Sequence, residues 1–261
     1  MARVVVITGG TSGIGEATSI YLRDKGFTVY SLARHLKDEP GINYLLCDVS
    51  NKESVEKAFF EVERREGKID DVISNAGMGI SGAFEYTSKE DANKILSVNL
   101  IGSTNVLSAA IPYLKKSKGH MIQIGSIAGE LPIPFQTYYS MTKASVEILA
   151  QSLSLELKPF GIRVSCVLPG DTKTGFTANR VKDNNDDTYG NRIARSVEKM
   201  EKDETKGASP IKVSKVIYRC LKRKNPPTKV AVGFSYKLIR LLTKILPTRF
   251  INWALYQLYG R

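Results

Sequence analysis

The sequence of 261 residues has little of the material from which disulfide frameworks and metal centres are built. It contains three cysteines, Cys47, Cys166 and Cys220, which lie far apart and show no paired spacing. Paired cysteines are the usual sign of a disulfide-stabilised secreted domain or of a structural zinc site. Their absence predicts a protein of a reduced compartment, with no disulfide and no bound metal.

Long hydrophobic runs are also missing. The apolar run at residues 4–7 is too short for the core of a signal peptide, and no window of 18 or more apolar residues is present for a spanning helix. We therefore expect a cytoplasmic protein. With 42% apolar and 25% charged residues, the chain has enough apolar material for one large α/β domain or two small ones.

The net charge of +12 by itself fits a nucleic acid, an anionic membrane surface or an acidic carrier protein as partner. Nucleic-acid-binding surfaces combine basic runs with interleaved aromatic residues, and outside the C-terminus the chain has no long run of this kind. We therefore expect no nucleic-acid partner.

Short apolar runs alternate with longer segments of helical periodicity along most of the chain. The runs that predict strands are 4–7, 28–33, 43–47, 71–74, 121–124, 163–168 and 230–232, and the main helical patterns are 52–65, 89–114, 140–157 and 210–222. Apolar strands that alternate with helices are typical of a parallel sheet covered on both faces. Because no repeat or linker divides the chain, we predict one α/β domain with three layers (α/β/α) around a doubly wound parallel sheet.

The glycine-rich segment 8–15 predicts a pyrophosphate site. It follows the first strand directly, and a helical pattern begins at Ile14. Glycines let the backbone approach a ligand closely, while the free N–H groups and the dipole of a helix N-terminus attract an anion. The residues expected to contact a dinucleotide are Thr8, Gly9, Thr11, Ser12, Gly13, Ile14 and Gly15. The alternative is a tight strand–helix turn without a ligand.

The end of the second predicted strand carries no acidic residue. An acidic residue there would accept a hydrogen bond from a ribose 2′-hydroxyl and repel a 2′-phosphate. The sequence has Ala33 followed by Arg34 instead, and a guanidinium favours a 2′-phosphate. We therefore predict that NADP(H) is preferred over NAD(H). The alternative for Arg34 is a solvated loop charge.

Two further strand ends carry candidate cofactor contacts. Asp48, next to Val49, could accept a hydrogen bond from an adenine amino group, or it could cap the following helix, for which Ser50 is as good a candidate. The turn made by Asn75, Ala76 and Gly77 consists of small residues, so a cofactor ring can lie against its backbone.

Tyr139 and Lys143 lie one turn apart on a predicted helix and therefore share a face. A neighbouring cation lowers the pKa of a phenol from its usual ~10, which suits a proton donor or acceptor near neutrality. The same spacing recurs at Tyr21/Lys25 and Tyr218/Lys222. Tyr139 differs because it follows a strand that ends in Ser126, at the edge where open α/β sheets bind ligands.

Two polar residues elsewhere need separate interpretations. Asn99 lies within a helical pattern, where asparagine is unfavourable, so its amide is predicted to have a function; a helix position without one is the alternative. His120 begins the fifth strand, at the opposite edge of the predicted sheet, and is interpreted as structural.

These motifs, in this order, resemble those of the classical short-chain dehydrogenases/reductases. The match extends from about residue 3 to residue 176 and comprises the glycine segment 8–15, Asp48, Ser74 to Gly77, Asn99, Ser126, the Tyr139/Lys143 pair and Pro169-Gly170 with Thr174. Ser74 stands where the family usually has asparagine, and Thr172 where it more often has valine or isoleucine. The resemblance implies a Rossmann-type fold and an oxidoreductase.

The resemblance also implies a role for each residue. Tyr139 would exchange a proton with the substrate oxygen as hydride moves to or from the nicotinamide, and Ser126 would hydrogen-bond the same oxygen. Lys143 would bind the ribose hydroxyls and lower the Tyr139 pKa. Asn99 would hold a water that passes protons to bulk solvent. The cofactor contacts would be completed by Pro169, Gly170, Thr172 and Thr174. The family also suggests a homodimer or homotetramer.

Two segments outside these motifs concern the substrate. Residues 176–207 carry seven basic and seven acidic residues with a thin apolar pattern, and are predicted to form a substrate lid within a catalytic domain 1–233. The tail 234–261 has five basic residues and no acidic one. Its apolar stripes are Leu238, Leu241, Leu242, Ile245 and Leu246 and, beyond Pro247, Phe250, Ile251, Ala254, Leu255 and Leu258.

This tail composition is typical of a pair of amphipathic helices at a membrane interface. Packing against the body, the lid or a second subunit explains it equally well. We expect an NADP(H)-dependent enzyme that reduces an apolar or lipid-like ketone. The alternative is a module that binds NADP(H) and uses the tail for a partner; the complete set of Asn99, Ser126, Tyr139 and Lys143 argues against it.

Overall fold

The computed structural model describes residues 2–176, 180–182 and 188–261. In this part of the chain, seven parallel strands form a central sheet in the order β3-β2-β1-β4-β6-β7-β9. The strands are β1 Val4–Thr8, β2 Thr28–Ala33, β3 Ile42–Leu46, β4 Asp71–Ser74, β6 His120–Ile124, β7 Arg163–Leu168 and β9 Lys229–Ala231. The predicted strands are confirmed, with boundaries shifted by one residue at several ends.

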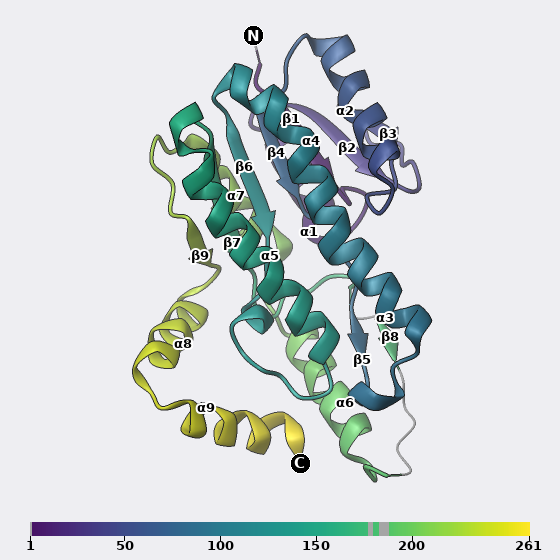
Figure 1. Ribbon diagram of the computed structural model, residues 1–261, viewed down its shortest axis with the longest axis vertical. Helices are drawn as coiled ribbons and strands as arrows, with labels where there is room; N and C mark the ends of the chain where they lie inside the picture. Colours follow the sequence, from purple (N-terminus) through teal and green to yellow (C-terminus); the bar gives the residue numbers. More distant parts are fainter. Residues whose placement is uncertain (1, 177–179, 183–187) are drawn as a thin grey trace.

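Helices cover both faces of the sheet (Figure 1). On one face lie α1 (Gly13–Arg23) and α7 (Pro210–Lys222), and on the other α2 (Lys52–Glu66), α4 (Gly102–Ser117) and α5 (Thr137–Glu156). Two apolar cores result, one containing Leu22 and Ile217 and the other Phe59 and Leu107. Strands that are buried between two helical layers must be apolar on both faces, which explains the short apolar runs in the sequence. The predicted three-layer, doubly wound fold is confirmed.

The predicted helix at 89–114 is part of a longer helical stretch, Lys89–Ser117. It consists of α3 (Lys89–Ile95), a π-helical segment (Leu96–Ile101) and α4. By length and composition this stretch could cross a membrane, so the expectation that no such stretch exists is wrong. Its α4 part, however, buries Leu107 and neighbouring apolar residues in the core, as a central helix of an α/β domain does.

The segment 176–207 is more regular than the sequence analysis predicted. Residues 177–179 and 183–187 lie outside the described residues, but Arg192–Thr205 forms helix α6. This helix buries Ile193, Val197 and Met200, which are spaced four and three residues apart on one face. The prediction of a weakly patterned segment is therefore wrong for α6. Before it, β8 (Val181–Lys182) pairs with β5 (Ile80–Ser81).

The tail forms helices α8 (Phe234–Ile245) and α9 (Thr248–Leu255), followed by a π-helical turn (Tyr256–Gly260). The predicted break at Pro247 is confirmed. Figure 1 shows the two helices extending away from the end of β9 and returning toward α6 at the C-terminus. The tail is bonded to the body at both ends, through Arg240 to Glu130 at 2.6 Å and through Tyr259 to Asp203 at 3.0 Å.

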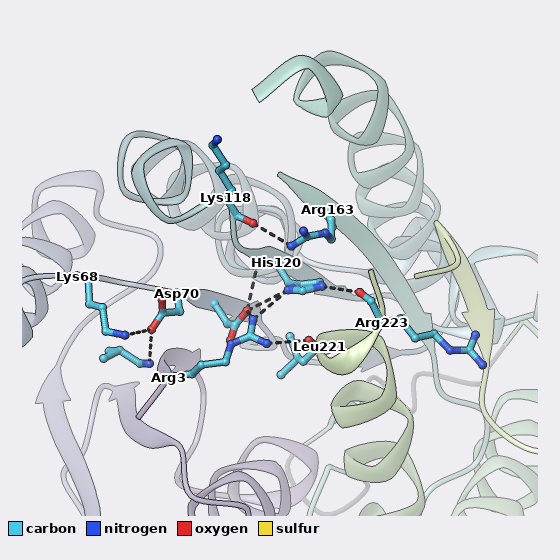
Figure 2. Close-up of polar contacts among 10 residues, drawn as sticks. Arg3, Lys68, Asp70, Lys118, His120, Arg163, Leu221 and Arg223 are labelled. Atoms are coloured by element: carbon cyan, nitrogen blue, oxygen red, sulfur yellow. Dashed lines mark hydrogen bonds and ion pairs between the residues drawn. The ribbon is translucent and has the colours of Figure 1, made fainter. Parts of the chain in front are cut away.

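A buried polar cluster closes the amino edge of the sheet (Figure 2). Arg3 Nη2 lies 2.5 Å from Asp71 Oδ1 and 3.0 Å from His120 Nδ1, and Arg3 Nη1 donates to the Leu221 carbonyl at 2.9 Å. The second ring nitrogen of His120 lies 3.1 Å from the Arg223 carbonyl. The cluster joins β4 and β6 to the end of α7. As predicted, His120 lies far from the carboxyl edge.

Candidate functional site

A cavity of about 1020 Å³ runs along the carboxyl edge of the sheet. Its walls include most of the residues predicted from the sequence: Gly9, Thr11, Ser12, Gly13, Ile14, Arg34, Asp48, Val49, Asn75, Ala76, Gly77, Ser126, Tyr139, Lys143, Pro169, Gly170, Thr172 and Thr174. The remaining three, Thr8, Gly15 and Asn99, are buried outside this wall. Parallel pairing brings these separate segments to one edge.

The glycine turn between β1 and α1 fits a pyrophosphate. Gly9 and Gly13 have φ values of +67° and +55°, which other residues rarely adopt. A Cβ atom on Gly15 would lie 2.1 Å from the Gly9 carbonyl oxygen, so the turn closes only with glycine there. Ser12 precedes α1 without a side-chain capping bond, which leaves the first N–H groups directed at the cavity.

A set of hydrogen bonds between Thr8 and Asn75 fixes this turn to the end of β4. The Thr8 hydroxyl accepts from the backbone N–H groups of Asn75 and Ala76, at 3.0 and 3.1 Å. The Asn75 amide donates to the carbonyls of Thr8 and Gly9, at 3.0 and 3.3 Å. Thr8 is fully buried, so in this structure it supports the turn from behind.

Arg34 and Asp48 lie at the end of the cavity where the sequence placed them. Arg34 is exposed to solvent. Asp48 Oδ1 accepts from the backbone N–H and the hydroxyl of Ser50, at 2.9 and 2.7 Å. Helix α2 is capped by Asn51, whose side chain accepts from the Ser54 N–H. The predicted alternative, a cap by Asp48 or Ser50, is therefore wrong.

Tyr139 and Lys143 project from the first turns of α5 into the middle of the cavity. The Lys143 Nζ lies 5.8 Å from the centre of the Tyr139 ring and donates to the Ile124 carbonyl at 3.1 Å. The hydroxyl of Ser126, two residues after the end of β6, accepts a hydrogen bond from the Ala128 N–H at 3.1 Å. The structure therefore brings together three of the four predicted catalytic residues around one point.

Burial governs the titration of this pair. It raises the pKa of Tyr139 to about 12, an effect that the neighbouring Ser126 hydroxyl and the Arg180 charge only partly oppose. It lowers the pKa of Lys143 to about 8. The predicted lowering of the Tyr139 pKa by Lys143 is wrong for this structure, because desolvation of the phenolate outweighs the nearby positive charges. At neutral pH, Tyr139 keeps its proton and can donate it.

Asn99 lies in the π-helical segment between α3 and α4, a type of distortion that often marks functional sites. Its amide exchanges two hydrogen bonds with the backbone of Met78, at 2.8 and 2.9 Å, and donates to the Thr142 hydroxyl at 3.1 Å. These bonds connect the loop after β4 to α5. The proton-relay role of Asn99 stays a prediction.

The tail forms a wall of the cavity, in agreement with the alternative that it packs against the body. The apolar residues of α8, α9 and the last turn on this wall are Ile239, Leu242, Leu246, Phe250, Ile251, Ala254, Leu255 and Leu258. Tyr236 packs where a side chain at Gly170 would be, and its hydroxyl donates to Asp171 Oδ2 at 2.5 Å. The stripes were visible in the sequence, but the surface that they cover was not.

The chain belongs to the short-chain dehydrogenase family. Residues 3–185 match the family described as short chain dehydrogenase, and the fold and the site arrangement agree with the resemblance inferred from the sequence. This membership makes the protein an oxidoreductase of the class that binds NAD(P)(H) and acts on carbonyl or alcohol substrates.

Several known proteins are similar over nearly the whole chain. The 3-ketodihydrosphingosine reductase of Bacteroides thetaiotaomicron is 36% identical, over 99% of this chain and 98% of that protein. A probable short-chain type dehydrogenase/reductase of Helicobacter pylori is 30% identical, over 94% and 93%. The crystal structure of a short-chain dehydrogenase from Streptomyces avermitilis, 24% identical, covers 98% of this chain and 96% of its own with a TM-score of 0.84, and so has the same fold.

The pKa of Lys143 predicts that dinucleotide binding depends on pH. In the free protein this lysine is protonated below pH about 8 and neutral above it. Because the ammonium form donates more strongly to ribose hydroxyls and attracts phosphate, we expect NADPH affinity to fall about tenfold between pH 7 and pH 9.5, as measured by fluorescence titration. Lys143→Met should bind more weakly and show a flat profile; an equal decline in this variant would assign the effect to another group.

Proposed function

We propose that the protein is an NADP(H)-dependent reductase of long-chain apolar ketones. The observation that carries the proposal is the position of Tyr139 and Ser126, which lie in one cavity between the glycine turn and the apolar wall of the tail. A ketone bound there would have its oxygen at the proton donor and its alkyl chain against α8 and α9. The full-length similarity to 3-ketodihydrosphingosine reductase, whose name denotes a long-chain 2-amino-1-hydroxy-3-ketone as substrate, supports the choice.

The residues of the chain divide the reaction between them. NADPH, when bound, supplies the hydride. The glycine turn would hold the pyrophosphate, and Lys143 would donate to the ribose hydroxyls. Ser126 holds the substrate oxygen by a hydrogen bond, and Tyr139 gives its proton to that oxygen as negative charge develops. Tyr139 is protonated at neutral pH, as donation of a proton to the substrate oxygen requires.

The lid proposed for 176–207 is supported by helix α6, from which Met200 and Glu204 reach the cavity wall. In this proposal the lid would cover the part of the cavity that binds substrate, within a catalytic domain formed by residues 1–233.

An NADP(H)-binding module without catalysis is the competing function. A module of this kind needs the glycine turn and the end of β2, but not a buried lysine. Desolvation of Lys143 disfavours its charged form, and proteins rarely retain such a cost without a use for the perturbed group. The burial of Lys143 beside Tyr139 therefore favours the enzyme.

Removal of the phenol hydroxyl tests the mechanism. We expect Tyr139→Phe to lower kcat by about 10²-fold to 10⁴-fold, the usual contribution of a general acid, with NADPH affinity nearly unchanged. Tyr138→Phe is the matched control, because Tyr138 stacks on Phe84 and is not part of the cavity wall. Turnover of a long-chain ketone is followed by NADPH absorbance. Full activity of Tyr139→Phe would refute the role of Tyr139.

Arg34 tests the cofactor preference. The exposed guanidinium at the end of β2 is proposed to pair with the 2′-phosphate, which NADH lacks. We expect the parent protein to bind NADPH at least about tenfold more tightly than NADH, and Arg34→Ala to erase most of the difference, since a charge-assisted bidentate contact is worth roughly 1.5–3 kcal/mol. NADH affinity should stay the same in the variant. Comparable affinities in the parent would contradict the assignment.

The outer side of α8 supports a peripheral contact between this cytoplasmic enzyme and an anionic membrane. Phe234, Leu238, Leu241 and Ile245 share one helical face and are 83%, 46%, 54% and 70% exposed. Exposed basic residues flank this face, namely Lys237, Lys244 and Arg249, and residues 234–261 contain no acidic side chain. An apolar face bordered only by positive charge matches a bilayer of anionic lipids.

Vesicle flotation measures this contact. We expect the full chain to float with phosphatidylglycerol vesicles at low salt and Leu241→Glu to remain unbound. Phe60→Glu, which places the same charge at an exposed aromatic residue of α2, should float like the parent. If Leu241→Glu floats like the parent, or if it changes only the oligomeric state, the face binds another surface.

The proposed homodimer or homotetramer has separate support. Ile148 and Leu155 on α5 are exposed and lie seven residues apart on the same helical face. A second copy of the chain is the proposed partner for this face.

A further inference from the structure

A buried ion pair lies beside the proposed proton donor. Arg180 is 6% exposed, and its Nη2 donates to Oε1 of Glu204, a residue of the cavity wall. The ring of Phe176 lies next to both Tyr139 and this ion pair. Its centre is 5.5 Å from the ring centre of Tyr139 and 5.7 Å from the guanidinium carbon of Arg180. The charges of Arg180 and Glu204 both act on the Tyr139 phenol, in opposite directions. The pair is therefore close to the reaction centre.

Arg180 has one donor group left for a ligand. The Nη1 group of Arg180 is buried and has no hydrogen-bond partner among the described residues. A buried donor without a partner is unfavourable, and native structures rarely retain one unless a ligand or water completes it. A neighbouring ion pair, Lys182 with Glu201 at 2.5 Å, already joins the same short segment to α6. Holding this segment against the helix therefore does not explain Arg180.

The charges of the site restrict the ligand. Arg180 and Glu204 together are neutral, so a phosphate or carboxylate on the substrate would meet a carboxylate as well as a guanidinium. A substituent pair with a cationic donor for Glu204 and a neutral acceptor for Arg180 matches the two groups one to one. An ammonium can donate to Glu204, and a hydroxyl oxygen can accept from Nη1 of Arg180.

We propose that Arg180 and Glu204 select the substrate by binding the hydroxyl and the amino group that a long-chain amino ketone carries on one side of its reacting carbonyl. This inference rests on the proposed function and adds the determinant of its specificity. The tail meets α6 at the same place, since the Tyr259 hydroxyl donates to Asp203, the neighbour of Glu204. The polar end of the substrate and its alkyl chain would thus bind to adjoining parts of one cavity.

The test compares two ketones of equal chain length, a 2-amino-1-hydroxy-3-ketone and the plain 3-ketone. Loss of a buried polar partner in a site built for it reduces kcat/KM steeply, so we expect the parent to prefer the amino ketone by at least about 10²-fold. Glu204→Gln, which keeps the size of the side chain, should reduce this ratio at least about tenfold. Glu201→Gln removes a carboxylate of the same helix outside the cavity wall and should keep the ratio.

A binding measurement makes the test independent of turnover. Calorimetry with NADP⁺ present should show that the product, a 2-amino-1,3-diol, binds the parent more tightly than the plain long-chain 3-alcohol. Glu204→Gln and Arg180→Met should remove this difference.

Three results would overturn the inference. These are equal kcat/KM for both ketones in the parent, an equal loss on both ketones in Glu204→Gln, and preference for a phosphorylated ketone. In each of them the enzyme still reduces a long-chain ketone, so the proposed function stands. A parent protein that binds NADPH and reduces no long-chain ketone would instead overturn the proposed function, and the inference with it.

Discussion

Parallel pairing of β1 with β2 and β4 is the constraint on which the site depends. It aligns Val5 with Val29 and with Asp71, so the three strands run in the same direction and end at one edge. The glycine turn, Arg34 and the small-residue turn after β4 follow from these three ends. The bonds between Thr8 and Asn75 then hold the first and third of these segments together. A dinucleotide cradle results from strand direction and one pair of polar side chains.

Desolvation is the second physical effect that shapes the site. Lys143 is buried and Tyr139 is half-buried, and desolvation favours the neutral form of each. The phenol therefore holds its proton more tightly, while the ammonium loses its proton more easily than in water. A substrate oxygen in the proposed position would meet a protonated phenol in a partly desolvated site, where electrostatic interactions are stronger than in water.

The tail lines the cavity with one side and forms part of the molecular surface with the other. One side of α8 and most of α9 cover the apolar part of the cavity, while Phe234, Leu238, Leu241 and Ile245 face outward. Arg240 fixes α8 through Glu130, which also pairs with Lys229 at the start of β9, and Lys229 in turn pairs with Glu147 of helix α5. This chain of charges links the wall of the cavity to the helix that carries Tyr139.

The sequence by itself determined the layered fold, the order of the strands along the chain and the residues at their carboxyl ends. These features follow from local patterns, since apolar runs, glycine turns and helical periodicity depend on near neighbours. Tertiary structure decided the rest: the raised pKa of Tyr139, the bonds of Asn99 to Met78, the surface under the tail and the meeting of Arg180 with Glu204. Each of these depends on contacts or burial created by segments far apart in the chain, which no local pattern encodes.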